Sequence, residues 1–195
     1  MCPDESRSGV SAFHDTVLFL AYLAAGLAAA TVAGWLTLGG IIFAQPAFLL
    51  RYLAVGFSGA LIYVAVRTRG LLLALVMILT LLAGNILLSN SWDGRSLAEA
   101  AIWAAFAGGA YLGAALLFRV LRRFFLGKFV FMGALLATAY AAGSVAVLLL
   151  RGRPLHTGVI LNPAIAGLRL GALSGFLFEV VDLVGLKLGG PGRTR

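Results

Sequence analysis

The sequence predicts an all-α polytopic membrane protein with about six transmembrane helices. Of its 195 residues, 62% are hydrophobic and only 11% are charged, and the mean hydropathy is +1.03. A soluble domain of this size would need more polar surface, because apolar atoms can cover only part of an exterior that faces water. Several apolar runs also reach the length of about 20 residues that crosses a hydrocarbon core. The chain is therefore expected to lie within a lipid bilayer.

Six apolar segments are predicted to span the membrane, joined by short connections. They divide the chain into a polar N-terminal tail (1–15), a single six-helix domain (16–187) and a basic C-terminal tail (188–195). The connections are too short to hold a soluble domain. The predicted spans are Thr16 to about Leu36, about Phe48 to Val66, Leu71 to about Leu88, Leu97 to about Phe118, Phe129 to Leu150, and about Leu168 to Leu186.

The distribution of basic residues predicts that both termini lie on the cytoplasmic side. The second and fourth connections and the C-terminal tail hold most of the Arg and Lys residues, as the positive-inside rule requires. The third connection instead mixes Asp93 and Glu99 with Arg95. Arg151 and Arg153 are exceptions that fall on the outer side. The expected location is a bacterial inner membrane or an organellar inner membrane.

Several other functions are not expected from this composition. The formal charge of +8 follows from the positive-inside rule, so nucleic acid is not an expected partner. The one cysteine, Cys2, lies in a polar tail, and His14 and His156 are not paired at ligand spacing, so no metal or other cofactor is predicted. Ser58 has no histidine in a later span to activate it. We therefore expect no catalytic residues and no enzyme.

A parallel internal repeat is predicted from two similar stretches. Each contains glycine, apolar residues, an amide side chain, Pro-Ala and an arginine, and a Ser-Gly pair follows. The first stretch runs from Gly39 to Arg51 and the second from Gly158 to Arg169. Helices 1-2 and 5-6 would then be related, and parallel repeats occur in several transporter folds. The alternative is that Ala, Gly and Leu recur by chance in membrane helices.

The two Pro-Ala segments, 39–48 and 157–166, are apolar although each would join two spans on the outer side. Apolar segments interrupted by Gly and Pro suggest broken or re-entrant backbone, which membranes tolerate only where protein or water satisfies it. The alternative is that Pro46 and Pro163 lie in the first turn of long tilted helices, where proline costs little.

The tripeptide Asn162-Pro163-Ala164 is similar to the paired boxes of the aquaporin-like channels. Here Gln45 replaces the asparagine of the first box, and Ile165 stands where the second box usually carries arginine. The sequence is therefore assigned to no family.

Evenly spaced glycines predict close packing between helices. Gly167, Gly171 and Gly175 are four residues apart and share one helical face, where small residues let two backbones approach. Gly109 and Gly113 offer a second such face. The spacing does not distinguish a contact within the chain from a homodimer.

Two acidic residues, Glu179 and Asp182, continue the line of that glycine face. Acidic groups inside a span are costly and usually face protein or water. They would either relay protons or bind a cation, or form ion pairs with Arg67, Arg69 or Lys187.

Two arginines, Arg51 and Arg169, are predicted near the outer membrane boundary at matching depth. They either extend to the interface along their apolar stems or join Gln45 and Asn162 in binding an anion, for which the planar guanidinium is well suited.

The resulting hypothesis is a small membrane channel or transporter-like module with a site for an anionic or small polar solute between helices 2 and 6. The alternative is a non-catalytic structural or substrate-binding subunit of a larger membrane complex. Expected partners are the lipid bilayer and either further copies of the chain or other membrane subunits. The candidate ligand-binding residues are Arg51, Arg169, Gln45, Asn162, Glu179 and Asp182.

Overall fold

A computed structural model describes residues 5–68, 79, 93–120 and 127–188, and this part of the chain is helical with short turns. The third predicted span, 71–88, lies outside the described residues apart from Leu79. Among the described residues, segments long and apolar enough to cross a membrane occur in four helices, and a fifth helix carries the shorter apolar segment Phe48–Val64. These helices fit the predicted integral membrane protein, whereas the count of six spans and the repeat stay predictions. The helices are α1 (Glu5–Leu38), α2 (Ile41–Ala44), α3 (Pro46–Thr68), α5 (Gly94–Val120), α6 (Gly127–Leu150) and α7 (Thr157–Leu188).

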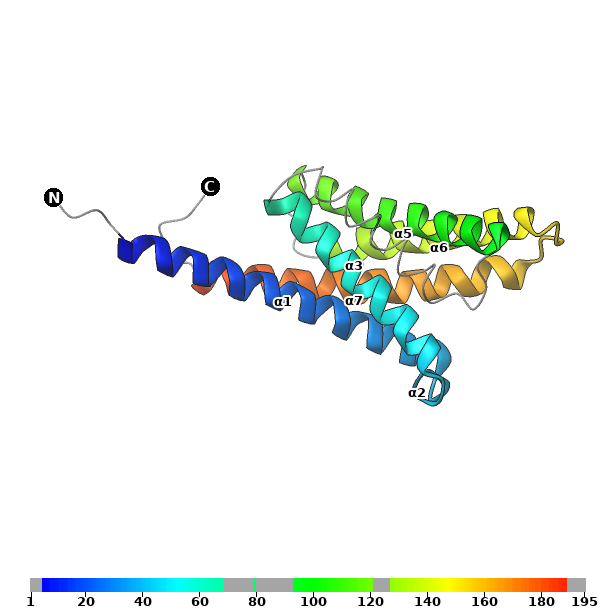
Figure 1. Ribbon diagram of the computed structural model, residues 1–195, viewed down its shortest axis with the longest axis horizontal. Coiled ribbons are helices and arrows are strands. Elements are labelled where there is room, and N and C mark those ends of the chain that lie inside the picture. Colours follow the sequence, from blue (N-terminus) through cyan, green and yellow to red (C-terminus); the bar gives the residue numbers. More distant parts are fainter. Residues whose placement is uncertain (1–4, 69–78, 80–92, 121–126, 189–195) are drawn as a thin grey trace.

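The five long helices form a ring in which α1 packs on α3 and α7, α6 packs on α5 and α7, and α3 packs on α5. Figure 1 shows α1 and α7 side by side, with α1 beginning and α7 ending at the same end of the molecule. Helices α3 and α5 run in the same direction, because Gly59 faces Tyr111 and Tyr63 contacts Phe118. The chain therefore leaves α3 at one end of the molecule and enters α5 at the other, as the predicted intervening span requires.

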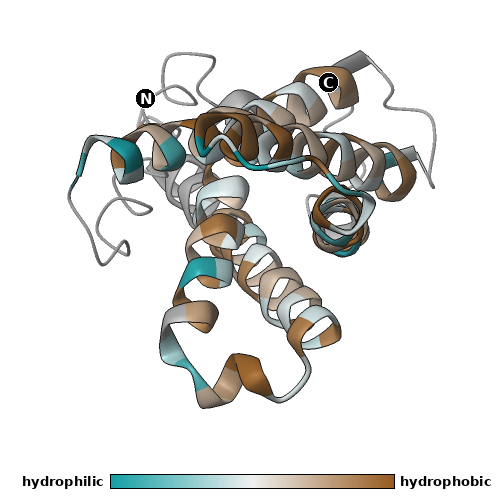
Figure 2. Cartoon of the chain, turned by 90° about the vertical axis from the view of Figure 1, so that its right-hand side faces the viewer, coloured by the Kyte–Doolittle hydropathy of each residue, from teal (hydrophilic) through white to brown (hydrophobic). Residues whose placement is uncertain are grey.

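The outer surface of this ring is apolar. Figure 2 shows hydrophilic colour mainly on connecting segments and helix ends, while the helices themselves are largely apolar. A surface of this kind is unfavourable in water and is what a lipid-facing helix needs. Exposed large apolar side chains occur on every long helix and include Leu20, Leu50, Leu116, Val130, Leu168 and Phe176.

Local signals fix several helix ends. Asp93 caps the start of α5, where its carboxylate accepts a hydrogen bond from the Ser96 backbone N–H at 2.9 Å. Hydrogen bonds from Ser96 lower the pKa of Asp93. Helices α1 and α6 each end at a glycine with positive φ, Gly39 (60°) and Gly152 (61°). Glycine is the residue that adopts this left-handed conformation without strain, so the turns after α1 and α6 both use a glycine at this point.

The two Pro-Ala segments have different structures. In the first, the short helix α2 is followed by Gln45 in an extended conformation, and Pro46 is the first residue of α3. In the second, α7 runs without a break from Thr157 through Pro163. Broken or re-entrant backbone is therefore wrong for the second segment. The apolar helix that corresponds to the last predicted span starts at Thr157 instead of at about Leu168.

A side chain of the neighbouring helix explains how α7 tolerates its proline. Proline inside a helix has no N–H to donate to the carbonyl four residues earlier, which in α7 belongs to Val159. The Ser144 hydroxyl of α6 donates to that carbonyl at 2.8 Å. Inside a membrane an unsatisfied backbone group costs several kcal/mol, so this bond allows the helix to continue through Pro163.

This explanation predicts that Ser144→Ala destabilises the protein only while Pro163 is present. Loss of the bond leaves the Val159 carbonyl without a partner, at a cost of about 1–3 kcal/mol. In a Pro163→Ala background the new backbone N–H restores the helical bond, so the same substitution should cost much less. Thermal unfolding of the four proteins in detergent measures the coupling, and equal losses in both backgrounds would contradict it.

Candidate functional site

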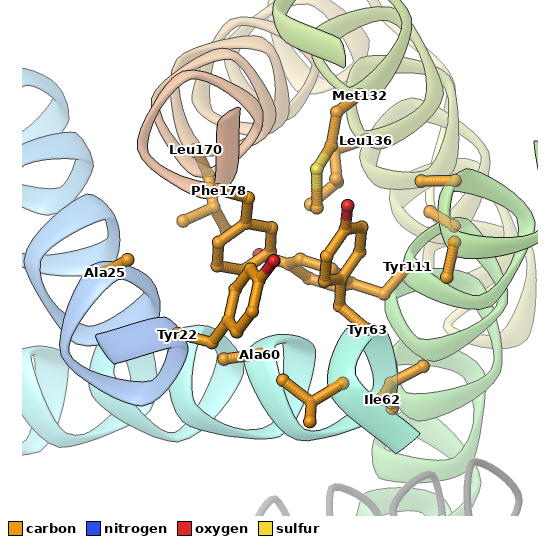
Figure 3. Close-up of a cluster of buried hydrophobic side chains, with 14 of the residues drawn as sticks. Tyr22, Ala25, Ala60, Ile62, Tyr63, Tyr111, Met132, Leu136, Leu170 and Phe178 are labelled. Atoms are coloured by element: carbon orange, nitrogen blue, oxygen red, sulfur yellow. The ribbon is translucent and has the colours of Figure 1, made fainter. Parts of the chain in front are cut away.

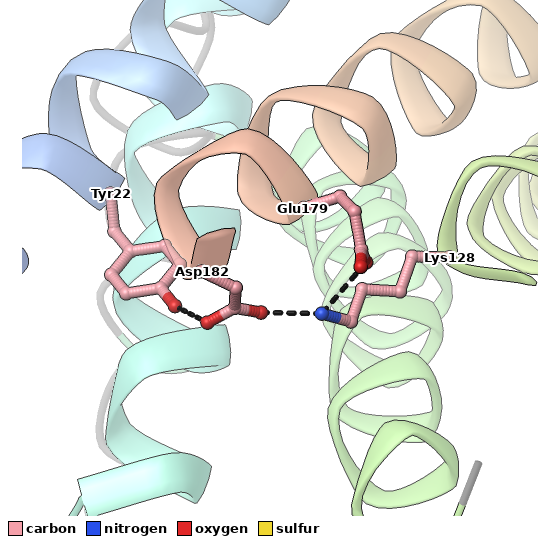
Figure 4. Close-up of polar contacts among 4 residues, drawn as sticks. All are labelled: Tyr22, Lys128, Glu179 and Asp182. Carbon is pink, nitrogen blue, oxygen red and sulfur yellow. Dashed lines mark hydrogen bonds and ion pairs between the residues drawn. The ribbon is translucent and has the colours of Figure 1, made fainter. Parts of the chain in front are cut away.

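A buried polar cluster joins α1, α6 and α7 near the end of the molecule where α6 begins and α7 ends (Figure 4). The Lys128 ammonium lies 2.8 Å from Glu179 Oε2 and also donates to Asp182 Oδ2. The Tyr22 hydroxyl donates to the other oxygen of the Asp182 carboxylate, Oδ1. We call these four residues the acid–lysine cluster. It brings together two of the six candidate ligand-binding residues, Glu179 and Asp182.

The glycine face of α7 positions this cluster. Glu179 lies four residues after Gly175, so its side chain continues the face that packs on α6. A Cβ at Gly175 would lie 2.8 Å from the carbonyl carbon of Lys128. The two backbones are therefore in contact at Lys128, and its ammonium reaches both carboxylates of the next turn.

The predicted glycine contact is confirmed, and it lies within the chain. A Cβ at each of the three glycines would collide with backbone atoms of α6, so α6 and α7 pack without intervening side chains. The opposing pairs are Gly167 with Leu136, Gly171 with Met132, and Gly175 with Lys128.

The second predicted glycine face does not show such packing. In the described part of the chain, no heavy atom lies within 4 Å of a Cβ built at Gly109 or Gly113. Gly109 is also exposed.

The charged side chains of the cluster are mostly removed from the surface. Lys128, Glu179 and Asp182 are 14%, 16% and 9% exposed. Charges buried to this degree are tolerated only when paired. The pairing is uneven, because Glu179 Oε2 is buried and makes no aligned hydrogen bond, although the ammonium is close to it.

The ring of Tyr22 packs among the buried side chains of the hydrophobic core, beside Tyr63 and Phe178 (Figure 3). The Tyr22 ring lies 5.6 Å from the Tyr63 ring and 5.7 Å from the Phe178 ring, between centroids, and Tyr63 stacks on Phe178 at 4.7 Å. Tyr22 therefore belongs to the apolar core through its ring and to the cluster through its hydroxyl. Deeper in the ring of helices, the buried hydroxyls of Tyr111 and Ser174 lie 3.2 Å apart.

The other candidate residues lie toward the opposite end of the bundle. Arg169 donates a hydrogen bond to the Leu36 carbonyl at 2.5 Å. This carbonyl is in the last turn of α1, where carbonyls lack helical partners, so Arg169 caps α1. Arg51, Gln45 and Asn162 are exposed. The described contacts do not join these four residues into one site, and anion binding there stays a prediction.

Sequence reasoning did not identify Lys128 and Tyr22 as partners of the carboxylates. Neither residue was among the candidate ligand-binding residues. The expected partners were Arg67, Arg69 and Lys187, whose side chains are outside the described residues. The sequence places Lys128 in the first turn of a predicted span. That this span packs on the glycine face of α7 is seen only in the structure.

Comparison of the chain with protein-family models, with curated proteins and with solved structures finds no match. In the described residues, the protein is all-helical, with helices long and apolar enough to cross a membrane and an ion-paired acidic cluster between α6 and α7. Within the described residues, no group of three or more His, Cys, Asp and Glu side chains is placed to hold a metal ion.

Proposed function

We propose that the chain is a small integral membrane channel or transporter-like module whose ion site is the acid–lysine cluster. The observation that supports it best is the pair of carboxylates, Glu179 and Asp182, around Lys128 inside apolar helices. Ionisable residues within spans are costly and usually belong to ion pathways or proton relays. The glycine face already holds α6 against α7, so this helix contact does not need buried charges.

The cluster also links ion binding to helix contacts. Lys128 belongs to α6, the carboxylates to α7, and Tyr22 to α1. An ion that binds a carboxylate competes with the ammonium for that oxygen and so weakens one contact between α6 and α7. Transport proteins need such a coupling, because binding must favour one arrangement of helices over another.

The predicted site for an anionic or small polar solute at Arg51 and Arg169 belongs to the same class of function. It has weaker support, because the Arg169 guanidinium is bonded to the end of α1.

A subunit of a larger membrane complex is the second candidate function. It is favoured by the exposed Gly109 on α5, which with Gly113 forms a small-residue pair that no described side chain covers. Small residues four apart allow a partner helix to approach closely.

Ion flux into proteoliposomes tests the proposal. Purified protein would be challenged separately with proton, sodium, potassium and chloride gradients. We expect cation or proton flux in the wild type, flux near background in Glu179→Gln and Asp182→Asn, and wild-type flux in Glu99→Gln. Glu99 is a matched control because its side chain is 17% exposed, close to the 16% of Glu179, and it is paired with the 43% exposed Arg151 away from the cluster.

Two other results would change the conclusion. Chloride flux that is lost in Arg51→Lys and Arg169→Lys but kept in the acid variants would place the site at the opposite end. Absence of any flux together with co-purifying membrane proteins would favour the subunit of a larger complex.

A further inference from the structure

We propose that the ion exchanged at the acid–lysine cluster is a proton and that Glu179 is the residue that accepts it. This inference rests on the proposed function and deepens it, because it names the ion and the atom group that carries it. Three features of the cluster support it: the place of the ammonium, the difference between the two carboxylates, and their exposure.

The Lys128 ammonium occupies the place that a metal cation would need. It lies 2.8 Å from Glu179 Oε2 and donates to Asp182 Oδ2, so it bridges the two carboxylates. Hard metal cations require several oxygen ligands around one position. Here the position between the two carboxylates is filled by the Lys128 ammonium. A proton needs no such position, because it binds directly to one carboxylate oxygen.

The two carboxylates are not equivalent as anions. Asp182 receives a donor on each oxygen, Lys128 on Oδ2 and Tyr22 on Oδ1. Hydrogen bonds of this kind stabilise the charged form of a carboxylate. Glu179 Oε2 is buried without an aligned hydrogen bond. Asp182 therefore has a donor on each of its oxygens, whereas the described partner of Glu179 Oε2 is the one ion pair with Lys128 at 2.8 Å.

The greater solvent exposure of its side chain also favours Glu179 as the residue that accepts the proton. The Glu179 side chain is 16% exposed, against 9% for that of Asp182. The described charged groups that face Glu179 are Lys128 from α6 and Asp182 on α7, and α1 contributes the Tyr22 phenol through Asp182.

The exchange step is a simple proton transfer. A proton adds to the Glu179 carboxylate and gives a neutral carboxylic acid, while Lys128 keeps its own proton and stays bonded to Asp182. The contact between Lys128 and Glu179 is then no longer an ion pair, so α6 and α7 lose one ionic contact at this turn. Release of the proton restores the ion pair.

Infrared spectroscopy of the full-length protein in lipid vesicles tests this assignment without measuring transport. The carbonyl band of protonated carboxylic acids would be followed as the pH falls. The spectrum of each variant would then be subtracted from that of the wild type at the same pH. We expect one component to be lost in Glu179→Gln and kept in Asp182→Asn and Glu99→Gln. Added sodium should not shift the titration of this component.

A second variant keeps the test decisive if Glu179→Gln folds poorly. Lys128→Gln removes the facing ammonium, so the Glu179 component should persist to higher pH than in the wild type. Loss of the component in Asp182→Asn alone, no shift in Lys128→Gln, or displacement by sodium would each overturn the inference. Sodium flux that depends on the cluster would also overturn it while leaving the proposed transport function intact.

Discussion

A Gly171→Leu variant is expected to be severely destabilised, because its new side chain has no room between α6 and α7. A Cβ at this position would lie 2.7 Å from the Met132 carbonyl carbon and 2.9 Å from Gly133 Cα. Both are backbone atoms, so no rotamer change relieves the collision and the two helices must separate. Overpacking costs about 1–3 kcal/mol in well-packed cores, and we expect the upper end of that range.

Gly109→Leu is the matched control for this substitution. It makes the same chemical change within a helix, including the gain of about 1 kcal/mol in helix propensity, at a site where no described atom lies within 4 Å of the added Cβ. Thermal unfolding in detergent should therefore show a large loss for Gly171→Leu and little for Gly109→Leu. Similar unfolding temperatures for both would contradict close packing of α6 on α7.

The parts of the fold that sequence reasoning predicted depend on local patterns. The first, fourth and fifth spans match apolar segments that begin or end within a few residues of the expected positions, Thr16–Leu38, Gly94–Phe118 and Gly127–Leu150. Glycines spaced by four predicted a close helix contact because that spacing places them on one face. Hydropathy and spacing are properties of a single helix, so neither requires knowledge of its neighbours.

The start of α7 was mispredicted because it depends on another helix. Pro163 was expected either in broken or re-entrant backbone or in the first turn of a helix, since proline within a helix is unfavourable. The compensating donor, Ser144, is 15 residues away from Val159 in the sequence. Nothing in the segment around Pro163 announces that donor, and only the packing of α6 on α7 brings it into place.

Only part of the candidate site was predicted, because some of its residues are brought together by contacts between helices. Glu179 and Asp182 stand out as acidic residues in an apolar run, so one helix is enough to identify them. Lys128 becomes their partner only through the register of α6 against α7, and Tyr22 only through the packing of α1. The arginines were identified from the predicted repeat and from their depth, but neither reveals that Arg169 caps the end of α1.

Lys128→Met is expected to destabilise the protein by about 3–5 kcal/mol, the range found when one partner of a buried ion pair is removed. The substitution leaves Glu179 and Asp182 close together without the ammonium that bridges them. The Tyr22 hydroxyl still donates to Asp182, but one neutral donor does not replace a charge. Thermal unfolding in detergent at neutral pH measures the loss.

Arg151→Met provides the comparison with an ion pair near the surface. Arg151 bonds both oxygens of Glu99 at 2.6 and 2.7 Å, and its side chain is 43% exposed. Glu99 is 17% exposed, but the charge removed here is the solvent-exposed one. Pairs with an exposed partner contribute about 0–1 kcal/mol, so this variant should unfold closer to the wild type than Lys128→Met. Equal losses for Arg151→Met and Lys128→Met would contradict the burial of the acid–lysine cluster.

Neutralising the whole cluster separates stability from function. In Lys128→Met/Glu179→Gln/Asp182→Asn no buried charge is left unpaired in the described cluster, and replacing buried ion pairs by neutral groups is often neutral or stabilising. We expect this triple variant to recover most of the stability lost in Lys128→Met and still to show no ion flux. A stable but inactive protein would mean that the charges serve transport. If it instead unfolds as readily as Lys128→Met, the cluster holds α1, α6 and α7 together, and the main support for a transport module is removed.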